Sequence, residues 1–170
     1  MDTTGRVHEV YAVSYRRLVG QLTGVTGDPV EAEDVVMEAF ARAVAKSRTF
    51  ATVDNPEAWL RTVAVNIARS RWRRVTRLRV LSPRLVDRSS YDDLSADRLA
   101  LLAALRTLPT GQREAIALHH LADLPVHEVA TTLGVPVGTV KAWLSRGRAR
   151  LAVLLDVDHD HHHDQEERHV

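Results

Sequence analysis

The most constraining feature of this sequence is a pair of short helices joined by a glycine turn, between residues 126 and 151. Gly134 can adopt the left-handed backbone conformation that ends a helix, and Pro136 suits the first position of the next helix. Apolar residues recur at helical spacing on both sides of this turn, which predicts one buried face on each helix. These residues are Val129, Ala130, Leu133, Val140, Leu144 and Leu151.

The second helix of this pair has a basic outer face. Lys141, Ser145, Arg146 and Arg148 lie away from its apolar side, and Trp143 lies beside that side. A short helix with an apolar back and a basic front, held by a tight turn, fits the major groove of DNA. A helical corner whose basic face is only solvated has the same local pattern. Geometry alone therefore leaves both interpretations open.

Charge is distributed unevenly along the chain, although the formal net charge is only +1. Residues 61–84 contain eight arginines and no acidic residue, whereas residues 28–38 contain five acidic residues and no basic one. The segment after Leu155 is acidic and rich in histidine. Blocks of this kind indicate separate surfaces for different partners.

The absence of cysteine and of common catalytic motifs limits the chemistry of this chain. Disulfides and thiolate metal sites are excluded. The sequence has no glycine-rich phosphate loop or nucleophile elbow, and His119, His120 and His127 lack further ligands at metal spacing, so we expect neither an enzyme nor a cofactor. No apolar run approaches the roughly 20 residues of a membrane helix, and residues 1–10 lack the apolar segment of a signal peptide. We therefore expect a cytoplasmic protein without membrane insertion.

The pattern of glycines, prolines and apolar residues predicts an all-α fold. Glycines and prolines are few and lie at candidate breaks, and no strand-like alternation persists beyond a few residues. We predict two small helical domains, residues 7–75 and 97–155, joined by a flexible linker at 76–96 that largely lacks helical periodicity. The acidic, histidine-rich tail at 156–170 is predicted to be disordered, with a composition that binds divalent metals only weakly.

Helix boundaries in the first domain follow from caps and apolar faces. A first helix is expected over residues 7–22, and Asp28 is expected to cap the second, with Glu31 three residues later as in a capping box. The second helix, 30–46, is expected to lead into a loop over 47–55. The residues of these two helices expected to face the core are Val10, Val13, Leu18, Leu22, Ala32, Val35, Val36, Ala39, Phe40 and Ala43.

Two more helices are expected in the second domain before the pair described above. The first spans residues 97–105, with Leu99, Leu102 and Leu105 directed inward. The second spans residues 111–121. Together with the helix pair they make up the predicted second domain.

Residues 108–151 resemble region 4 of bacterial sigma factors of the extracytoplasmic-function (ECF) group. The family pattern L-P-x-x-x-R-x-x-x-x-L is met here by Leu108, Pro109, Arg113 and Leu118. Trp143 stands where the family commonly has a polar residue, and Gly147 where it commonly has alanine. The resemblance implies that the second helix of the pair reads the −35 promoter element. The implied DNA-binding residues are Val137, Gly138, Thr139, Lys141, Ala142, Ser145, Arg146 and Arg148.

Residues 32–40 resemble the most typical helix of sigma region 2, A-E-D-x-x-Q-E-x-F, with Met37 in place of the usual glutamine. In the family this helix docks on the clamp helices of the RNA polymerase β′ subunit. A solvated face with one stabilising Glu38–Arg42 pair gives the same spacing. The polymerase-binding residues that the resemblance implies are Asp34, Met37, Glu38 and Arg42.

Residues 56–60, PEAWL, resemble the motif that opens the next helix of region 2, where Trp59 is a core anchor. The resemblance implies that the preceding loop, about residues 50–56, captures a flipped base of the −10 element together with Asn66. Arginines at near-helical spacing can follow the phosphates of the same strand. A membrane-surface helix is disfavoured, because only Trp72 could serve as its boundary aromatic. The implied −10 residues are Asn66, Arg69, Arg73 and Arg74.

The two motif sets lie in the order of an ECF sigma factor and cover about residues 8–155. The resemblance implies a transcription initiation factor that binds core RNA polymerase, through the β′ clamp helices and the β flap, and directs it to promoter DNA. It also implies an anti-sigma protein as a candidate partner. The alternative is a stand-alone helix-turn-helix regulator that binds an operator as a dimer. Such a regulator needs a sensor in its first half, and no ligand pocket or receiver strand is evident there.

Overall fold

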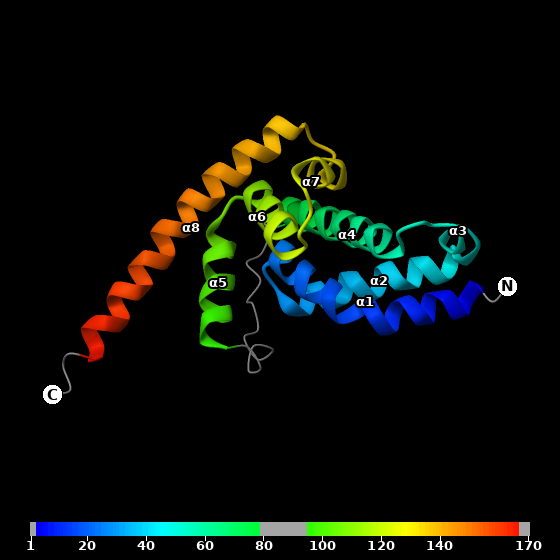
Figure 1. The fold of residues 1–170 in the computed structure, drawn as a ribbon, viewed down its shortest axis with the longest axis horizontal. Coiled ribbons are helices and arrows are strands. Elements are labelled where there is room, and N and C mark those ends of the chain that lie inside the picture. The colour runs from blue at the N-terminus through cyan, green and yellow to red at the C-terminus, as the bar shows by residue number, and fades with distance from the viewer. Residues whose placement is uncertain (1–2, 79–94, 167–170) are drawn as a thin grey trace. The chain divides into compact units, whose positions relative to one another are not determined.

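The computed structural model describes the backbone of residues 3–78 and 95–166, and the side chains of residues 4–78 and 95–156. Within these ranges every regular element is helical, which confirms the all-α prediction (Figure 1). The chain divides into two compact units. Helices α1 to α4 form the N-terminal unit and helices α5 to α8 form the C-terminal unit, and each is described by itself.

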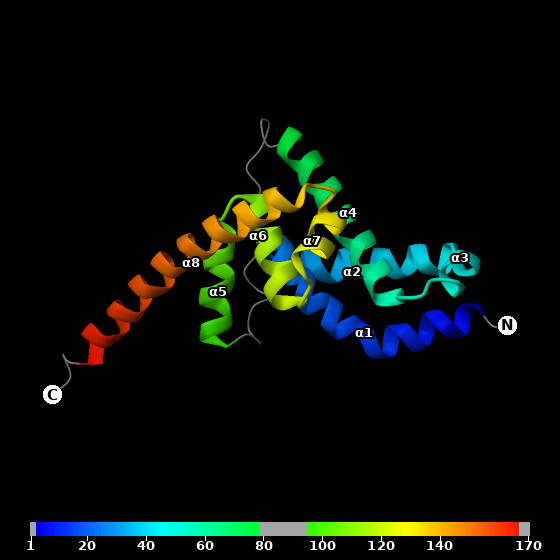
Figure 2. The same cartoon turned by 45° about the horizontal axis from the view of Figure 1, so that its top comes forward.

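The N-terminal unit is built on three long helices. These are α1 (Thr3–Thr26), α2 (Pro29–Ala45) and α4 (Pro56–Leu78), with the single-turn α3 (Ser47–Ala51) between the last two. Helices α1 and α2 run side by side in opposite directions, and α4 packs on both (Figure 2). The apolar stripe predicted for α2 is confirmed, because all six of its residues are buried. Its burial against α1 and α4 forms the centre of this unit.

Helix α1 is longer at both ends than the predicted range 7–22. In the added C-terminal turn, the Thr23 and Thr26 hydroxyls donate to backbone carbonyls one turn earlier. Val13, predicted to lie in the core, is 71% exposed, and the neighbouring Ser14 is buried instead. The reason is the helical period: Ser14 lies one turn before the buried Leu18 and two turns before the buried Leu22, on the same face.

Asp28 caps α2 as predicted. Its φ is extended, its carboxylate accepts the N–H of Val30 at 2.9 Å, and Pro29 follows at the first helical position. The expected capping-box role of Glu31 is wrong, because the N–H of Asp28 donates instead to the Thr26 hydroxyl at 3.2 Å, and the Glu31 carboxylate forms an ion pair with Arg71 of α4 at 3.3 Å. An inter-helix partner has therefore replaced the local one.

Residues 47–55 are not wholly the loop that was predicted. Residues 47–51 form α3, and Phe50 within it is 0% exposed. The Phe50 ring meets the half-buried Trp59 ring edge to face, with centroids 5.3 Å apart. Burial of this aromatic pair fixes α3 against the start of α4, which leaves only residues 52–55 as an open connection.

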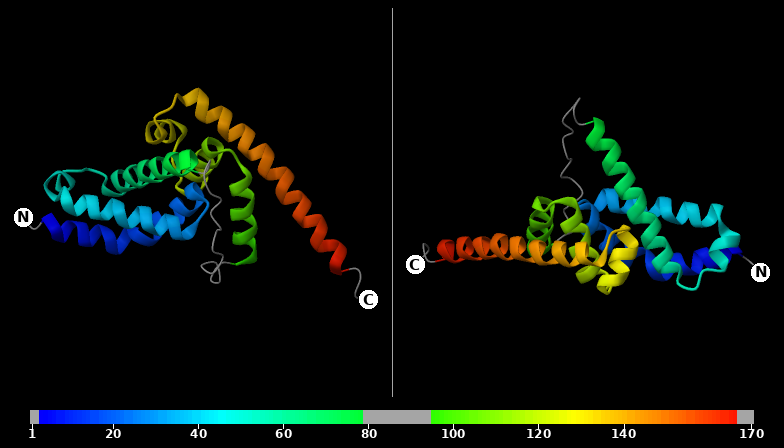
Figure 3. Two further views of the ribbon diagram at one scale, coloured as in Figure 1. Left: turned by 180° about the vertical axis from the view of Figure 1, so that it is seen from behind. Right: turned by 90° about the horizontal axis from the view of Figure 1, so that it is seen from above.

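The C-terminal unit surrounds the first half of a long helix. Helices α5 (Ala96–Thr107), α6 (Thr110–Ile116) and α7 (Val126–Leu133) all contact α8 (Val137–Glu166), as the views in Figure 3 show. The predicted helix 111–121 divides into α6 and the π-helical turn η2 (Ala117–Leu121). Leu99, predicted to point inward, is 37% exposed, because α5 buries the side that carries Leu102 and Leu105.

The predicted linker and tail are described only in part. Helix α4 continues to Leu78 and α5 begins at Ala96, so both ends of the expected linker 76–96 are helical, while residues 79–94 lie outside the described residues. The backbone of residues 156–166 continues α8, contrary to the prediction of a disordered tail, and residues 167–170 lie outside the described part. An anchored helix extends without a new nucleation cost, which favours this continuation. None of the helices described has the length and apolar character to span a membrane.

Candidate nucleic-acid interface

The turn between α7 and α8 is a Schellman motif built on Gly134. Gly134 has a φ of 65°, in the left-handed region. The N–H of Val135 donates to the Ala130 carbonyl at 3.1 Å, and the N–H of Gly134 donates to the Thr131 carbonyl at 3.3 Å. These bonds satisfy carbonyl oxygens that the end of α7 would leave unpaired. The predicted role of Gly134 is confirmed, and the turn gives α8 a fixed starting direction.

Pro136 immediately precedes α8, one residue before the position predicted for it. Its carbonyl accepts the N–H of Thr139 at 3.0 Å and that of Val140 at 3.3 Å. The fixed φ of proline suits both the position before a helix and its first residue, so a difference of one residue leaves the predicted role of Pro136 unchanged. The exposed residues Val137 and Gly138 then form the open first turn of α8, whose N–H groups point along the helix axis.

The first half of α8 has one buried side and one open side. Val140, Leu144 and Gly147 are buried, as predicted for the first two, while Leu151 is half-buried. All residues of the predicted −35 set are exposed or half-exposed. The structure therefore brings this set together on a single helix whose back is packed.

The basic residues of α8 are distributed on two flanks of its open side. Successive helical residues are rotated by about 100°, so Lys141 and Arg148 share one flank and Arg146 and Arg150 share the other. Ser145 lies between the flanks. A narrow centre of small residues between two rows of cations lets a helix approach base edges while the cations reach phosphates. Arg150 is exposed and was missing from the predicted set, although its spacing of four from Arg146 could have indicated it.

Trp143 and Gly147 serve packing within the C-terminal unit. A Cβ placed on Gly111 of α6 would lie 2.6 Å from the Trp143 ring, so the indole rests directly on the glycine backbone. A Cβ on Gly147 would lie 3.0 Å from the side chain of Ile116, which shows a second close approach of α6 and α8. The two departures from the family pattern therefore coincide with two close contacts between these helices.

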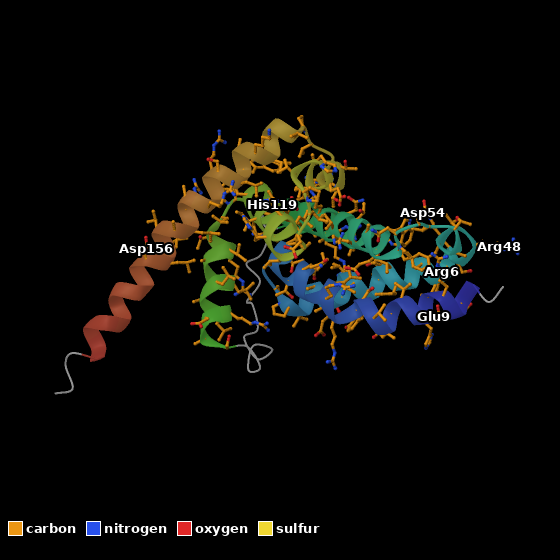
Figure 4. All side chains as sticks on the ribbon, in the orientation of Figure 1. Arg6, Glu9, Arg48, Asp54, His119 and Asp156 are labelled. Carbon is orange, nitrogen blue, oxygen red and sulfur yellow. The ribbon has the colours of Figure 1, made fainter. Side chains whose placement is uncertain are left out.

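The histidines next to α8 have identifiable surroundings. Figure 4 shows His119 on η2, where its Nδ1 lies 2.8 Å from the Leu124 carbonyl. Burial lowers the pKa of His120, and the nearby His119 and Arg148 act in the same direction. Among the described residues, none are grouped as a set of three or more possible metal ligands.

The predicted −10 residues share the outer side of α4. Asn66, Arg73 and Arg74 are exposed and Arg69 is half-exposed. The spacing of three and seven places Asn66, Arg69 and Arg73 on one face. The structure thus brings an amide and several guanidinium groups together along one helix, which can present a base-reading group beside a phosphate track.

Two arginines of the same run have a structural role instead. The buried Arg61 donates from Nε to the Gln21 amide oxygen at 2.9 Å, and from Nη2 to Glu57 at 3.2 Å. Arg71 donates to Glu38 at 2.6 Å and forms the pair with Glu31 described above. Charge composition alone could not distinguish these arginines from those on the outer face. The partners of Arg61 and Arg71 lie one turn earlier in α4 or on another helix.

Glu57 joins α1 to the start of α4. It accepts hydrogen bonds from Arg17, from the buried Ser14 hydroxyl at 3.2 Å and from Arg61. The bonds and charge of Arg17, with smaller contributions from Ser14 and Arg61, outweigh partial burial and lower the pKa of the Glu57 carboxyl. Because the Glu57 carboxylate accepts from three side chains, it holds the first turn of α4 in a fixed position against α1.

The predicted polymerase-binding residues differ in how free their side chains are. Asp34 is exposed and Met37 is 48% exposed, with its sulfur 4.0 Å from the Tyr11 hydroxyl. Glu38 is half-buried and accepts hydrogen bonds at 2.6 Å from both Arg42 and Arg71. Burial acts to raise the pKa of Glu38, but these bonds outweigh it and leave the pKa below its usual value. The predicted Glu38–Arg42 pair is confirmed, and Arg71 is a third member that the sequence did not indicate.

Replacing Glu57 with glutamine is expected to flatten the acid limb of the stability curve. The pKa of Glu57 is lower in the folded chain, so its carboxylate contributes stability above the unfolded-state pKa of about 4.3, and this contribution is lost as the pH falls through the folded-state pKa. Urea denaturation of the full chain between about pH 3 and pH 7 measures the slope. Glu9→Gln, at an exposed glutamate of α1, is the control. An unchanged slope in Glu57→Gln would contradict this role.

Comparison with known proteins gives the family of both units. Residues 10–78 match the family described as Sigma-70 region 2, and residues 98–151 match the family described as Sigma-70, region 4. The match over the first half also removes the alternative of a sensor domain joined to a helix-turn-helix.

Similar proteins support the same family across most of the chain. The RNA polymerase sigma-E factor of Streptomyces coelicolor is 35% identical over 127 residues, which are 73% of this chain and 71% of that protein. The ECF RNA polymerase sigma factor EcfG of Rhodopseudomonas palustris is 34% identical over 142 residues, or 79% of this chain and 76% of its own.

Two solved structures resemble the fold. The sigma factor RpoE in complex with the anti-sigma factor NepR, from Bartonella quintana, has a TM-score of 0.70 and 29% identity, covering 89% of this chain and 97% of that one. CnrH in complex with the cytosolic domain of CnrY has a TM-score of 0.61 and 26% identity, covering 89% and 88%. The chain is therefore a member of the sigma-70 family, an ECF-type sigma factor that acts as a non-catalytic transcription initiation factor and directs RNA polymerase to promoters.

Proposed function

We propose that this sigma factor divides promoter reading between two helices. Helix α8 reads the −35 element, and α4 with the preceding loop reads the −10 element as it melts. The observation that carries this division is the pair of open faces described above, each on a helix whose opposite side is packed into its own unit. A rigid helix presenting polar and basic groups is the form in which proteins read DNA edges and phosphates.

In the C-terminal unit, Lys141, Ser145 and Arg146 contact bases of the −35 element. Ala142, half-exposed at the centre of the open face, offers an apolar contact for a thymine methyl group. The open first turn of α8 donates to a phosphate through the N–H groups of Val137 and Gly138, and Thr139 follows them in the same turn. Arg148 contacts phosphate on the flank that it shares with Lys141.

In the N-terminal unit, Asn66 reads the edge of an unstacked base while Arg69, Arg73 and Arg74 follow the phosphates of the same strand. An exposed amide can donate to and accept from a base edge at once, which suits such a contact. We take the base-binding loop as residues 51–55, the last residue of α3 and the open connection after it, rather than 50–56, because the Phe50 side chain is fully buried.

Core polymerase binds α2 through Asp34, Met37, Glu38 and Arg42, on the β′ clamp helices, and the C-terminal unit contacts the β flap. The exposed Asp34 and Met37 supply a carboxylate and an adaptable apolar group side by side. The Glu38 carboxylate is already held by Arg71, so it offers polymerase a negative charge in a fixed position. Because the protein works with RNA polymerase on chromosomal promoters, we place it in the cytoplasm.

An anti-sigma protein is a further proposed partner. Two structurally similar proteins were solved with bound partners: the sigma factor RpoE with the anti-sigma factor NepR, and CnrH with the cytosolic domain of CnrY. A protein that covers the open faces of α2 and α8 would block polymerase and promoter together. Co-purification of the tagged chain from cells before and after stress would identify such a protein.

Lys141→Ala and Arg146→Ala are each expected to weaken promoter-dependent transcription and to relax base preference at one −35 position. Loss of a specific base contact costs about 1–3 kcal/mol. Arg148→Ala should instead weaken all sequences alike and lower the salt dependence of binding by about one ion. Run-off transcription with purified core polymerase, first on genomic DNA and then on −35 variants, measures both effects.

Arg98→Ala, at an exposed arginine of α5, is the matched control and should behave as the wild type. Unchanged transcription in both Lys141→Ala and Arg146→Ala would reject the −35 assignment. Failure of the purified chain to associate with core polymerase, together with tight dimeric binding to duplex DNA, would overturn the whole proposal.

A further inference from the structure

The first turns of α1 reach the loop between α3 and α4. Arg6 donates from Nη1 to the Ala51 carbonyl at 2.5 Å and from Nη2 to the Val53 carbonyl at 2.7 Å. Figure 4 shows Arg6 on α1, on the same side of the unit as Arg48 of α3 and Asp54 of the loop. Arg6 precedes residue 10, where the family match begins, so the contact comes from outside the matched region.

The Arg6 bonds add to the backbone pairing of this loop. The Thr49 and Phe50 carbonyls accept the N–H groups of Thr52 and Val53, at 3.1 and 3.2 Å. The carbonyl of Ala51, the last residue of α3, follows these two and accepts from the Arg6 guanidinium. A cation at the carboxyl end of a helix is also favoured by the helix dipole.

The other end of the loop is fixed by the start of α4. The Asn55 side-chain oxygen accepts the N–H of Ala58 at 3.0 Å, and its carbonyl accepts the N–H of Trp59 at 3.1 Å. Between these two anchored ends the side chains of Thr52 and Asp54 are exposed. The loop thus presents a defined set of polar groups instead of a range of conformations.

We propose that Arg6 is a positioning residue for −10 recognition: it holds loop 51–55 in the shape that receives the unstacked base. This rests on the proposed role of that loop. The planar fork of arginine supplies two parallel donors to two carbonyls, which a lysine ammonium cannot reproduce in the same geometry. A preformed loop saves the ordering cost that a free loop would incur when the base enters.

The test measures binding of holoenzyme to a fluorescent single-stranded oligonucleotide carrying the −10 region of a promoter found by run-off transcription. The same strand is made with an abasic site at each −10 position in turn. For wild-type holoenzyme, an abasic site at the captured position should weaken binding about tenfold. Arg6→Ala should weaken binding of the intact strand about fivefold and leave binding of that abasic strand unchanged.

Two further variants make the result specific. Arg6→Lys keeps the charge and can replace one of the two hydrogen bonds, so its loss on the intact strand should be about twofold and again confined to the captured position. Arg16→Ala, at an exposed arginine of the same helix, should match the wild type. Core-polymerase affinity should be unchanged in all three variants.

Either of two results would overturn the role of Arg6: equal weakening of the intact and abasic strands by Arg6→Ala and Arg6→Lys, which indicates a general structural effect, or no weakening of either strand. A wild-type holoenzyme that is insensitive to abasic sites throughout the −10 region would instead overturn base capture by the loop, and the Arg6 proposal with it.

Discussion

Phe50→Ala is expected to lower the free energy of unfolding by about 3–5 kcal/mol. The Phe50 side chain is fully buried and its ring packs edge to face on Trp59. Removing it leaves a cavity beneath α3 that the surrounding helices can fill only in part. Urea denaturation followed by tryptophan fluorescence measures the loss, and Trp59 beside the site contributes to that signal.

The control for Phe50→Ala is Val44→Ala, at an exposed apolar residue of α2, which should change stability by no more than about 0.5 kcal/mol. Loss of Phe50 should also impair −10 recognition by holoenzyme, because α3 and the loop that follows share this anchor. A loss of stability below about 1 kcal/mol would show that neighbouring side chains refill the space and that Phe50 does not anchor the loop.

Gly111→Ala is expected to destabilise the C-terminal unit by about 1–2 kcal/mol. The added Cβ would lie 2.6–2.9 Å from three atoms of the Trp143 ring, so the indole must move. Overpacking of this kind costs about 1–3 kcal/mol, and the gain of up to about 1 kcal/mol in helix propensity offsets only part of it. Thermal unfolding of the full chain, followed by circular dichroism, measures the difference.

A double-mutant cycle tests whether Trp143 is the cause. In a Trp143→Leu background the cost of Gly111→Ala should largely disappear, because the smaller side chain leaves room for the methyl group. Gly147→Ala is the matched control: its Cβ would lie 3.0 Å from the Ile116 side chain, farther than the 2.6 Å at Gly111, so strain and helix propensity should nearly cancel. An equal cost of Gly111→Ala in both backgrounds would contradict the direct contact.

These two sites explain how the unit tolerates its departures from the family pattern. Trp143 replaces a residue that is commonly polar, and its indole finds space only because position 111 is a glycine. Gly147 permits the second close approach of α8 to α6, at Ile116. The basic side chains of α8 are left on the open side as a result, and their contacts with the −35 element remain a prediction for the transcription experiments.

Much of the helical organisation could be predicted from the sequence. Local signals were sufficient for the Asp28 cap and the Gly134 turn, because each depends on the backbone preferences of one or two residues. The buried stripes of α2 and α7 followed from the helical period, which places every third or fourth residue on one face. The two motif sets likewise indicated the family that the comparisons show.

What the sequence determined by itself was therefore local: where helices end, which residues share a face and which family pattern they form. Only the tertiary structure decided which partner meets each polar side chain. Arg61 and Arg71 are held by Gln21 and the acidic residues of other turns, and Arg6 reaches a loop 45 residues away. The physical reason is that helical periodicity defines a face but not what packs against it, whereas a charged side chain acquires its role from the groups that the fold brings within hydrogen-bonding distance.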